Sequence, residues 1–159
     1  MSQTLLSDDM KEVLQTFPGS YVSTVGDDLV PQITRVVGLK VADGDHVLVY
    51  IPQWYSEQFL EAIAKRPSIA LVGVQVTTYR TFQFKGDVID TYPSTDDDVA
   101  SIEAYVDGFG QLIAHVGLDS TRYNSVYASP PFTTLKLRVD QVFDQTPRVG
   151  AGNLVKERA

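Results

Sequence analysis

The strongest pattern in the chain lies at residues 77–86 and predicts a β-strand with two unlike faces. Successive side chains of a strand point to opposite sides of the sheet. One side therefore carries polar groups and the other carries phenylalanines: Tyr79, Thr81, Gln83 and Lys85 against Phe82 and Phe84. Such a strand can hold a core behind and a ligand site in front. Gly86 follows, where the missing side chain lets the backbone bend or another group come close.

Six or seven segments in all have the composition of strands, and their short connections make neighbouring strands antiparallel. The segments are 21–25, 30–37, 38–41, 46–51, 69–74, 79–90 and 135–140. Residues 46–51 are almost wholly apolar, which predicts a central strand buried on both sides. In the last segment the apolar residues Leu135, Leu137 and Val139 are expected to face the core.

Helical patterns interrupt and flank these strands. A short helix is expected to start at Ser7, and a second at residues 55–66, with Ser56 able to cap it. Residues 96–116 start with three aspartates, which suit the positive end of a helix dipole rather than a metal cluster. A stripe follows at steps of three and four: Val99, Ile102, Val106, Phe109, Ile113 and Val116. We expect this stripe to pack on the barrel that the strands of its own chain form (see below). The alternative is that it packs on a partner subunit.

Composition favours one folded domain and excludes several classes of function. In a chain of 159 residues, 43% hydrophobic and 10% aromatic residues are ample for a core. A net charge of −7 with scattered basic residues argues against nucleic-acid binding. The absence of cysteine excludes disulfides and thiol nucleophiles, and two histidines are too few for a multi-histidine metal site. Without a signal-like start or an apolar run of about 20 residues, we expect a cytoplasmic protein that does not enter membranes.

The predicted strand set closes most economically as a small barrel with helices around it. The expected fold class is therefore mainly β. We expect a single domain over residues 1–159, with an N-terminal helix in 1–18, a helical insertion at 94–131 and a C-terminal tail or arm at 147–159. The insertion should hold one more short helix, capped by residues 119–121 and ending at 129–131.

Three segments, in their order and spacing, resemble the pyridoxamine 5′-phosphate oxidase-like family of flavin-binding split barrels. They are residues 30–40, 78–86 and 139–147, and the resemblance covers most of residues 17–150. The resemblance implies a six-stranded antiparallel split barrel. It also implies a homodimer that holds FMN at its interface, where both chains touch the cofactor.

The family's motifs map onto particular residues of this chain. An Arg-Val-Val-x-x-Lys strand, which meets the flavin phosphate and ring edge in the family's oxidases, corresponds to Arg35, Val36, Val37 and Lys40. An Arg-Gln-x-x-x-x-Gly strand matches Arg80 and Gly86, but Thr81 replaces the glutamine. The larger departure is Ser56-Glu57-Gln58, which stands where the oxidases carry Ser-Arg-Lys for the phosphate. Without a match for the oxidases' C-terminal Trp and Arg either, we do not expect oxidation of vitamin B6.

The residues expected to hold the cofactor are Arg35, Val36, Val37, Tyr50, Ile51, Pro52, Tyr55, Ser56, Thr81 and Gln83. Each has a plainer alternative. Arg35 takes the phosphate or pairs with an acid, residues 50–52 grip the flavin ring or pack the core, and Thr81 and Gln83 meet ring edges or form an exposed sheet face. Trp54 and Tyr55 stack on the ring, fill a dimer seam or cover the barrel mouth. Arg80 points the other way by alternation and is expected to be structural.

The sequence thus favours an FMN-binding flavoprotein, an oxidoreductase for a small molecule that the sequence does not identify. No residue is a convincing acid, base or nucleophile, which fits chemistry supplied by a cofactor. The alternative is a non-catalytic homodimer whose cleft holds a flavin, a deazaflavin, a haem-like ligand or nothing, and the Glu57-Gln58 replacement favours it. An enzyme without a cofactor is the third hypothesis.

Overall fold

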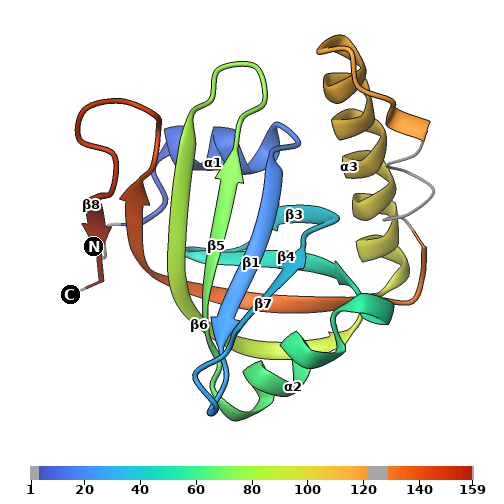
Figure 1. Ribbon diagram of the computed structural model, residues 1–159, viewed down its shortest axis with the longest axis vertical. Coiled ribbons are helices and arrows are strands. Elements are labelled where there is room, and N and C mark those ends of the chain that lie inside the picture. The colour runs from blue at the N-terminus through green and yellow to red at the C-terminus, as the bar shows by residue number, and fades with distance from the viewer. Residues whose placement is uncertain (1–3, 122–128, 159) are drawn as a thin grey trace.

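The computed structural model describes residues 4–121 and 129–158, and an antiparallel sheet dominates it (Figure 1). The strands are β1 (Gly19–Val25), β2 (Pro31–Arg35), β3 (Gly38–Val41), β4 (His46–Pro52), β5 (Ser68–Val74), β6 (Thr81–Pro93), β7 (Phe132–Asp144) and β8 (Asn153–Glu157). The helices are α1 (Asp8–Gln15), the 3-10 helix η1 (Gln53–Tyr55), α2 (Glu57–Lys65) and α3 (Asp96–His115). Hydrogen bonds join the strands in the order β2-β1-β5-β6-β7-β4-β3, and β8 pairs with β7. The mainly β fold class is confirmed, with eight strands in the described residues where six were expected.

Two consecutive valines close this sheet on itself. β2 and β3 stand at opposite ends of the strand order, yet only Val36 and Val37 separate them in the chain. The amide of Val36 donates to the carbonyl of Ser20 on β1 (3.2 Å), and the amide of Val37 donates to the carbonyl of Tyr50 on β4 (2.8 Å). The strand predicted over residues 30–37 is therefore interrupted here, because the chain leaves the ladder of β1 and enters that of β4.

The main hydrophobic core fills the barrel, and a helix covers each end. As predicted, Leu135, Leu137 and Val139 are fully buried. α1 adds Met10, Val13 and Leu14 to this core, and α2 adds Phe59 and Ile63. Figure 1 shows α1 across the top of the upright strands and α2 at their lower end. α2 begins at Glu57 rather than at residue 55, because the single turn of η1 precedes it.

Helix α3 packs on the barrel of its own chain, as expected, and stands upright beside it in Figure 1. Its buried side chains form a second cluster with Val37, Tyr50 and Phe132: Ile102, Tyr105, Val106, Phe109 and Ile113. The predicted stripe missed Tyr105, whose hydroxyl donates to the carbonyl of Pro18. None of the helices in the described ranges is long and apolar enough to cross a membrane.

The N-terminus of α3 is fixed by a capping box that also reaches the sheet. The amide of Asp98 donates to Thr95 Oγ1 (3.2 Å), and Asp98 Oδ2 accepts from the amide of Thr95 (3.0 Å) and from Thr134 Oγ1 on β7 (3.1 Å). Burial alone would raise the pKa of the Asp98 carboxyl, but these hydrogen bonds outweigh it and hold the pKa below 3.8. The aspartates therefore start the helix, as predicted, and Asp98 ties it to β7.

We expect Asp98→Ala to lower the free energy of unfolding by about 2 kcal/mol, because it removes a helix cap and leaves buried donors without an acceptor. Urea unfolding followed by the fluorescence of Trp54 measures the loss. The ionised carboxylate stabilises the fold fully above about pH 4, and this stabilisation is lost as the pH falls through the lowered pKa. The difference in the free energy of unfolding between the wild type and Asp98→Ala should therefore become smaller at acidic pH. Asp96→Ala, at an exposed position outside the capping box, is the control, and an equal loss in both variants would contradict the expectation.

β6 starts later and ends later than the sequence predicted. Tyr79 has a φ of 58°, and its amide donates to the carbonyl of Gln75 (2.8 Å), so it lies in the turn before β6 rather than on the strand. β6 begins at Thr81 and extends to Pro93, beyond the predicted end at Asp90.

The C-terminal tail contains a strand that the sequence analysis missed. Residues 147–159 were expected to be a loop or arm, but β8 pairs with β7 in this segment. The guanidinium of Arg158 donates to Asp140 on β7 (2.9 Å), which fixes the end of the tail against the barrel. The short helix predicted after Asp119 falls largely on residues 122–128, outside the described part of the chain.

Gly86 lies where the backbone of β7 comes close to that of β6, as its position in the sequence suggested. A Cβ atom added there would lie 1.9 Å from the carbonyl oxygen of Arg138 on β7. The pairing register also shifts between Lys85 and Gly86, which marks a β-bulge. The absence of a side chain at this position is therefore a requirement of the sheet.

Candidate functional site

The outward side of β2, β1, β5 and β6 forms one continuous surface, here called the outer face. Direct cross-strand pairs join Arg35 to Tyr21, Tyr21 to Val72, and Val72 to Gln83, so the four side chains form one row. Two residues along the strands, a second row consists of Ile33, Ser23, Ala70 and Lys85. In Figure 1 the viewer looks onto this face, and no helix of the described residues crosses it.

Large apolar side chains stand exposed on the outer face. Ile33 is 67% exposed, Val25 41% and Tyr21 40%. Single exposed apolar residues are common, whereas contiguous apolar patches are typical of surfaces that contact other molecules. The face thus has the character of an interaction surface.

Arg35 is held against aromatic rings at the edge of this face. Its Nη1 donates to the hydroxyl of Tyr21 (2.9 Å), and its Cζ lies 5.2 Å from the centroid of the Tyr21 ring. The guanidinium also lies near a second ring, that of Phe109 on α3, whose centroid is 6.0 Å from Cζ. Stacking and a hydrogen bond together orient the guanidinium, and a fixed guanidinium is a good receptor for phosphate or carboxylate.

Most of the other predicted cofactor residues lie inside the molecule. Val36, Val37, Tyr50 and Ile51 are fully buried, and Pro52 is buried as well. Val37 and Tyr50 belong to the α3 cluster, whereas Val36 and Ile51 belong to the barrel core. Burial, and next the negative charge of Asp98, raise the pKa of the Tyr50 hydroxyl. The strand predicted over residues 30–37 would by alternation place Val37 on the same face as Arg35, which is wrong because β2 ends at Arg35.

The Ser56 side chain, predicted to contact the cofactor at the start of α2, is buried. Ser56 is only 1% exposed, and its Oγ lies 2.7 Å from Oγ1 of Thr34. It occupies the N-cap position, as the sequence suggested, but its side chain makes no capping hydrogen bond. Tyr55 is half-buried in edge contact with the exposed Trp54, with ring centroids 4.6 Å apart.

An acidic groove of about 360 Å³ lies beside α2. Its lining comes from the β1–β2 hairpin and from α2, and it includes Asp27, Asp28, Glu61 and Lys65. Glu57 is exposed in the first turn of the same helix. The carboxylates outnumber the one lysine, so this region repels a phosphate rather than attracting it.

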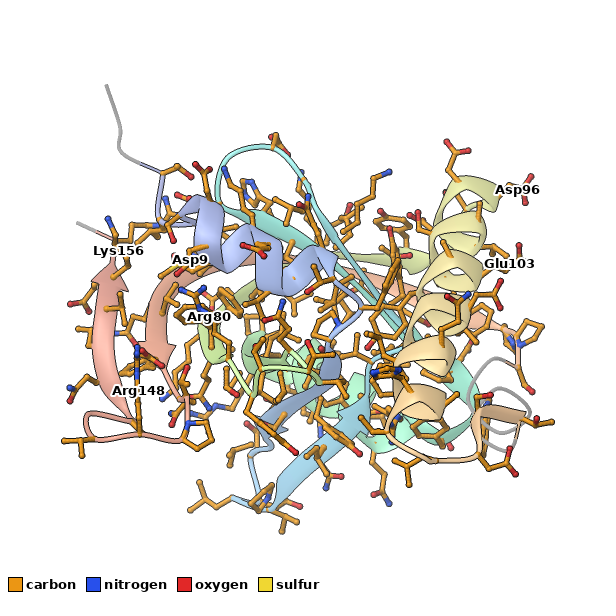
Figure 2. All side chains as sticks on the ribbon, turned by 90° about the horizontal axis from the view of Figure 1, so that it is seen from above. Asp9, Arg80, Asp96, Glu103, Arg148 and Lys156 are labelled. Atoms are coloured by element: carbon orange, nitrogen blue, oxygen red, sulfur yellow. The ribbon has the colours of Figure 1, made fainter. Side chains whose placement is uncertain are left out.

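The predicted residues of β6, and Arg80 just before it, divide between structural contacts and the outer face. Thr81 is buried, with its amide donating to Thr146 Oγ1 (3.1 Å) and its hydroxyl donating to the carbonyl of Tyr79 (2.8 Å). Gln83 is half-buried on the outer face and accepts a long hydrogen bond from Gln145 (3.5 Å). Arg80 pairs with Asp9 of α1, beside which Figure 2 shows it, so its predicted structural role is confirmed.

The predicted set is therefore split into four groups: Arg35 and Gln83 share the outer face, Thr81 is buried at the start of β6, residues 36–37 and 50–52 form the barrel seam and interior, and Tyr55 and Ser56 directly precede α2. Sequence reasoning missed Tyr21, Phe109 and Thr34. The hairpin pairing of β1 with β2 would have placed Tyr21 opposite Arg35, had the register been counted from the turn. Nothing local in the sequence brings Phe109 or Thr34 to the site.

No family model matches the chain, and no curated protein matches it in sequence. Solved structures do match. HupZ of Group A Streptococcus is 14% identical with a TM-score of 0.57, and the match covers 92% of this chain and 98% of that one. An F420 reductase is 15% identical with a TM-score of 0.55, covering 83% and 94%.

A third solved structure carries the description that the sequence resemblance suggested. It is a pyridoxamine 5′-phosphate oxidase-related, FMN-binding protein from Nostoc punctiforme, 15% identical with a TM-score of 0.52, and the match covers 90% of this chain and 85% of that one. At sequence identities this low, the similarity shows a shared fold and nothing about activity. The chain therefore has the split-barrel fold of pyridoxamine 5′-phosphate oxidase-like proteins, which the three sequence segments predicted.

Proposed function

We propose that this chain is an FMN-binding flavoprotein that works as a homodimer, with the flavin held where the outer faces of two copies meet. The observation that carries the proposal is Arg35, a guanidinium fixed by Tyr21 and Phe109 at the edge of an exposed apolar sheet face. The comparisons support the proposal, because the same fold occurs in a protein described as FMN-binding and in an F420 reductase.

The residues present fit FMN in part. Arg35 suits the flavin phosphate, and Gln83 in the same row offers an amide for a ring edge. The start of α2 does not fit the phosphate, because the Ser56 hydroxyl is buried against Thr34 and Glu57 faces solvent. The phosphate is therefore assigned to Arg35, whereas Val36 and Ile51 pack in the barrel core and Val37 and Tyr50 pack against α3.

Bound FMN would supply hydride and electron transfer. The chain's own contribution is binding, orientation and exclusion of water. The aromatic contacts of Arg35 limit the freedom of a long side chain before any ligand arrives, which lowers the entropic cost of binding. The apolar side chains of Tyr21 and Ile33 would exclude water where two copies meet.

We expect Arg35→Ala to weaken FMN binding by about 1.5–3 kcal/mol, the usual value of a charge-assisted hydrogen bond in a binding site. Titration of FMN into the apoprotein, followed by quenching of flavin fluorescence, measures the affinity. Arg148→Ala is the matched control, since Arg148 lies in the connection between β7 and β8, pairs with Asp144 and is not part of β2, β1, β5 or β6. Equal affinity of Arg35→Ala and the wild type would remove Arg35 from the site. Failure of the wild type to take up FMN would contradict the proposed function.

A second candidate function is flavin or deazaflavin binding without catalysis. The acidic residues around α2 favour this function, because the chain lacks the cations that the oxidases carry at the corresponding position. Addition of a reduced nicotinamide to the yellow protein separates the two functions. Bleaching of the flavin absorbance indicates an oxidoreductase, whereas an unchanged spectrum indicates a binding protein.

A further inference from the structure

A groove of about 490 Å³ opens on the outer face, at the end of β1 and β5 that lies nearest α2. Small side chains produce the depression: Ser23 and Ala70 face each other across the strands, and Gly86 lies at the bulge of β6. Val25 and Pro31 give the groove an apolar wall. Arg66 and Lys85 also line it, as do Asp87 and Asp140.

The acidic and basic groups of this groove differ in their partners. Asp87 accepts from Arg138 (3.1 Å) and from the hydroxyl of Ser68 (2.7 Å). Asp140 pairs with Arg138 (3.0 Å) and with Arg158 (2.9 Å). Arginines outside the groove thus neutralise both carboxylates.

The two groove cations have no such compensation. Within residues 4–121 and 129–158, neither Arg66 nor Lys85 makes an ion pair. Lys85 Nζ instead lies 4.6 Å from the centroid of the Phe143 ring. In a chain of net charge −7, the groove is therefore a local surplus of positive charge over an apolar wall.

We propose that this groove binds a small molecule with a flat apolar body and one anionic group, which Arg66 and Lys85 neutralise. The apolar wall at Val25 and Pro31 takes the body, and small residues at Ser23 and Ala70 make room for it. Both sites lie on the outer face, but Arg35, to which the flavin phosphate is assigned, does not line this groove. It is a candidate site for a substrate or effector, and it does not depend on FMN being the cofactor.

Anilinonaphthalene sulfonate, an aromatic anion whose fluorescence rises on binding, is a suitable probe. We expect saturable binding to the wild type, and about tenfold weaker binding to the double variant Arg66→Gln with Lys85→Gln, since two partly exposed charge contacts are lost. Lys65→Gln removes a lysine that does not line the groove, so it should leave the affinity unchanged. Arg35→Ala should also leave it unchanged.

The outcomes separate this inference from the proposed function. Absence of saturable binding, or equal affinity in the double variant and the wild type, overturns the inference. Loss of FMN binding in the double variant overturns it too, because the groove would then be part of the flavin site. A chain that binds no FMN but binds the probe in this charge-dependent way keeps the inference and loses the proposed function.

Discussion

Gly86→Ala should destabilise the fold by about 3 kcal/mol or more, at the upper end of what a single added methyl group does in a packed protein. The new Cβ would lie 1.9 Å from the carbonyl oxygen of Arg138 and 2.9 Å from its carbonyl carbon. Both are backbone atoms in the β7 ladder, so no side-chain rotation relieves the clash. β6 and β7 would have to separate at the bulge, where Arg138 also pairs with Asp87. Urea unfolding curves followed by Trp54 fluorescence measure the change.

Gly44→Ala provides the matched control. Gly44 has a φ of 58°, and a Cβ atom there would meet nothing within 4 Å. Its substitution therefore adds only the strain of a left-handed backbone, about 1–2 kcal/mol. If Gly86→Ala unfolds no more easily than Gly44→Ala, the close approach of β6 and β7 is wrong. A Gly86→Ala protein that expresses only in aggregates agrees with the expectation, whereas soluble, cooperative folding at wild-type stability does not.

Local patterns predicted the buried strands well, because burial imposes a visible periodicity. Residues 46–51 run apolar because one side of the strand fills the barrel and the other packs against the α3 cluster. Residues 135–139 alternate because only Leu135, Leu137 and Val139 fill the barrel. β8 escaped this kind of reasoning because every one of its residues is exposed. What holds it is a ladder to β7 and the pairing of Arg158 with Asp140, two contacts between distant parts of the chain.

The start of β6 shows the opposite error. Tyr79 continues the alternation of Thr81 and Gln83 by chance, but a positive φ and a hydrogen bond to Gln75 place it in a turn. Propensity gives little warning, because a non-glycine residue with positive φ is uncommon and tyrosine is not favoured there. Periodicity can therefore extend a predicted strand into a turn that tertiary contacts fix.

The candidate site was predictable only where it depends on single residues. Arg35 on an outward strand position follows from alternation, and the structure places it there. Val36 and Val37 were assigned to the cofactor by resemblance alone, yet their amides close the barrel to Ser20 and Tyr50. That role follows from the strand order of the whole sheet, which no local segment encodes. Ser56 is similar, since its burial depends on Thr34, which lies 22 residues away in the chain.

Ile33→Lys should convert the proposed homodimer into a monomer. Ile33 is the most exposed apolar residue among the strand positions of the outer face, at 67%. Two copies that meet through this face would have to bury the new ammonium without a partner, and a buried unpaired charge costs several kcal/mol. The single chain has a mass of 17.6 kDa, so light scattering after size-exclusion chromatography distinguishes one copy from two. FMN affinity should fall in parallel, because the proposed cofactor site lies at the contact.

Val116→Lys is the matched control for this prediction, since Val116 is also well exposed, at 52%, but follows the end of α3. It should leave both the mass and the FMN affinity unchanged. A wild-type chain that is already monomeric at micromolar concentration would contradict the homodimer. If the Ile33→Lys variant is still a dimer, the two copies meet through another surface. If the variant becomes monomeric but keeps its full FMN affinity, one chain is sufficient for the flavin. In that case Arg35, with Tyr21 and Phe109, would bind the phosphate without help from a second copy.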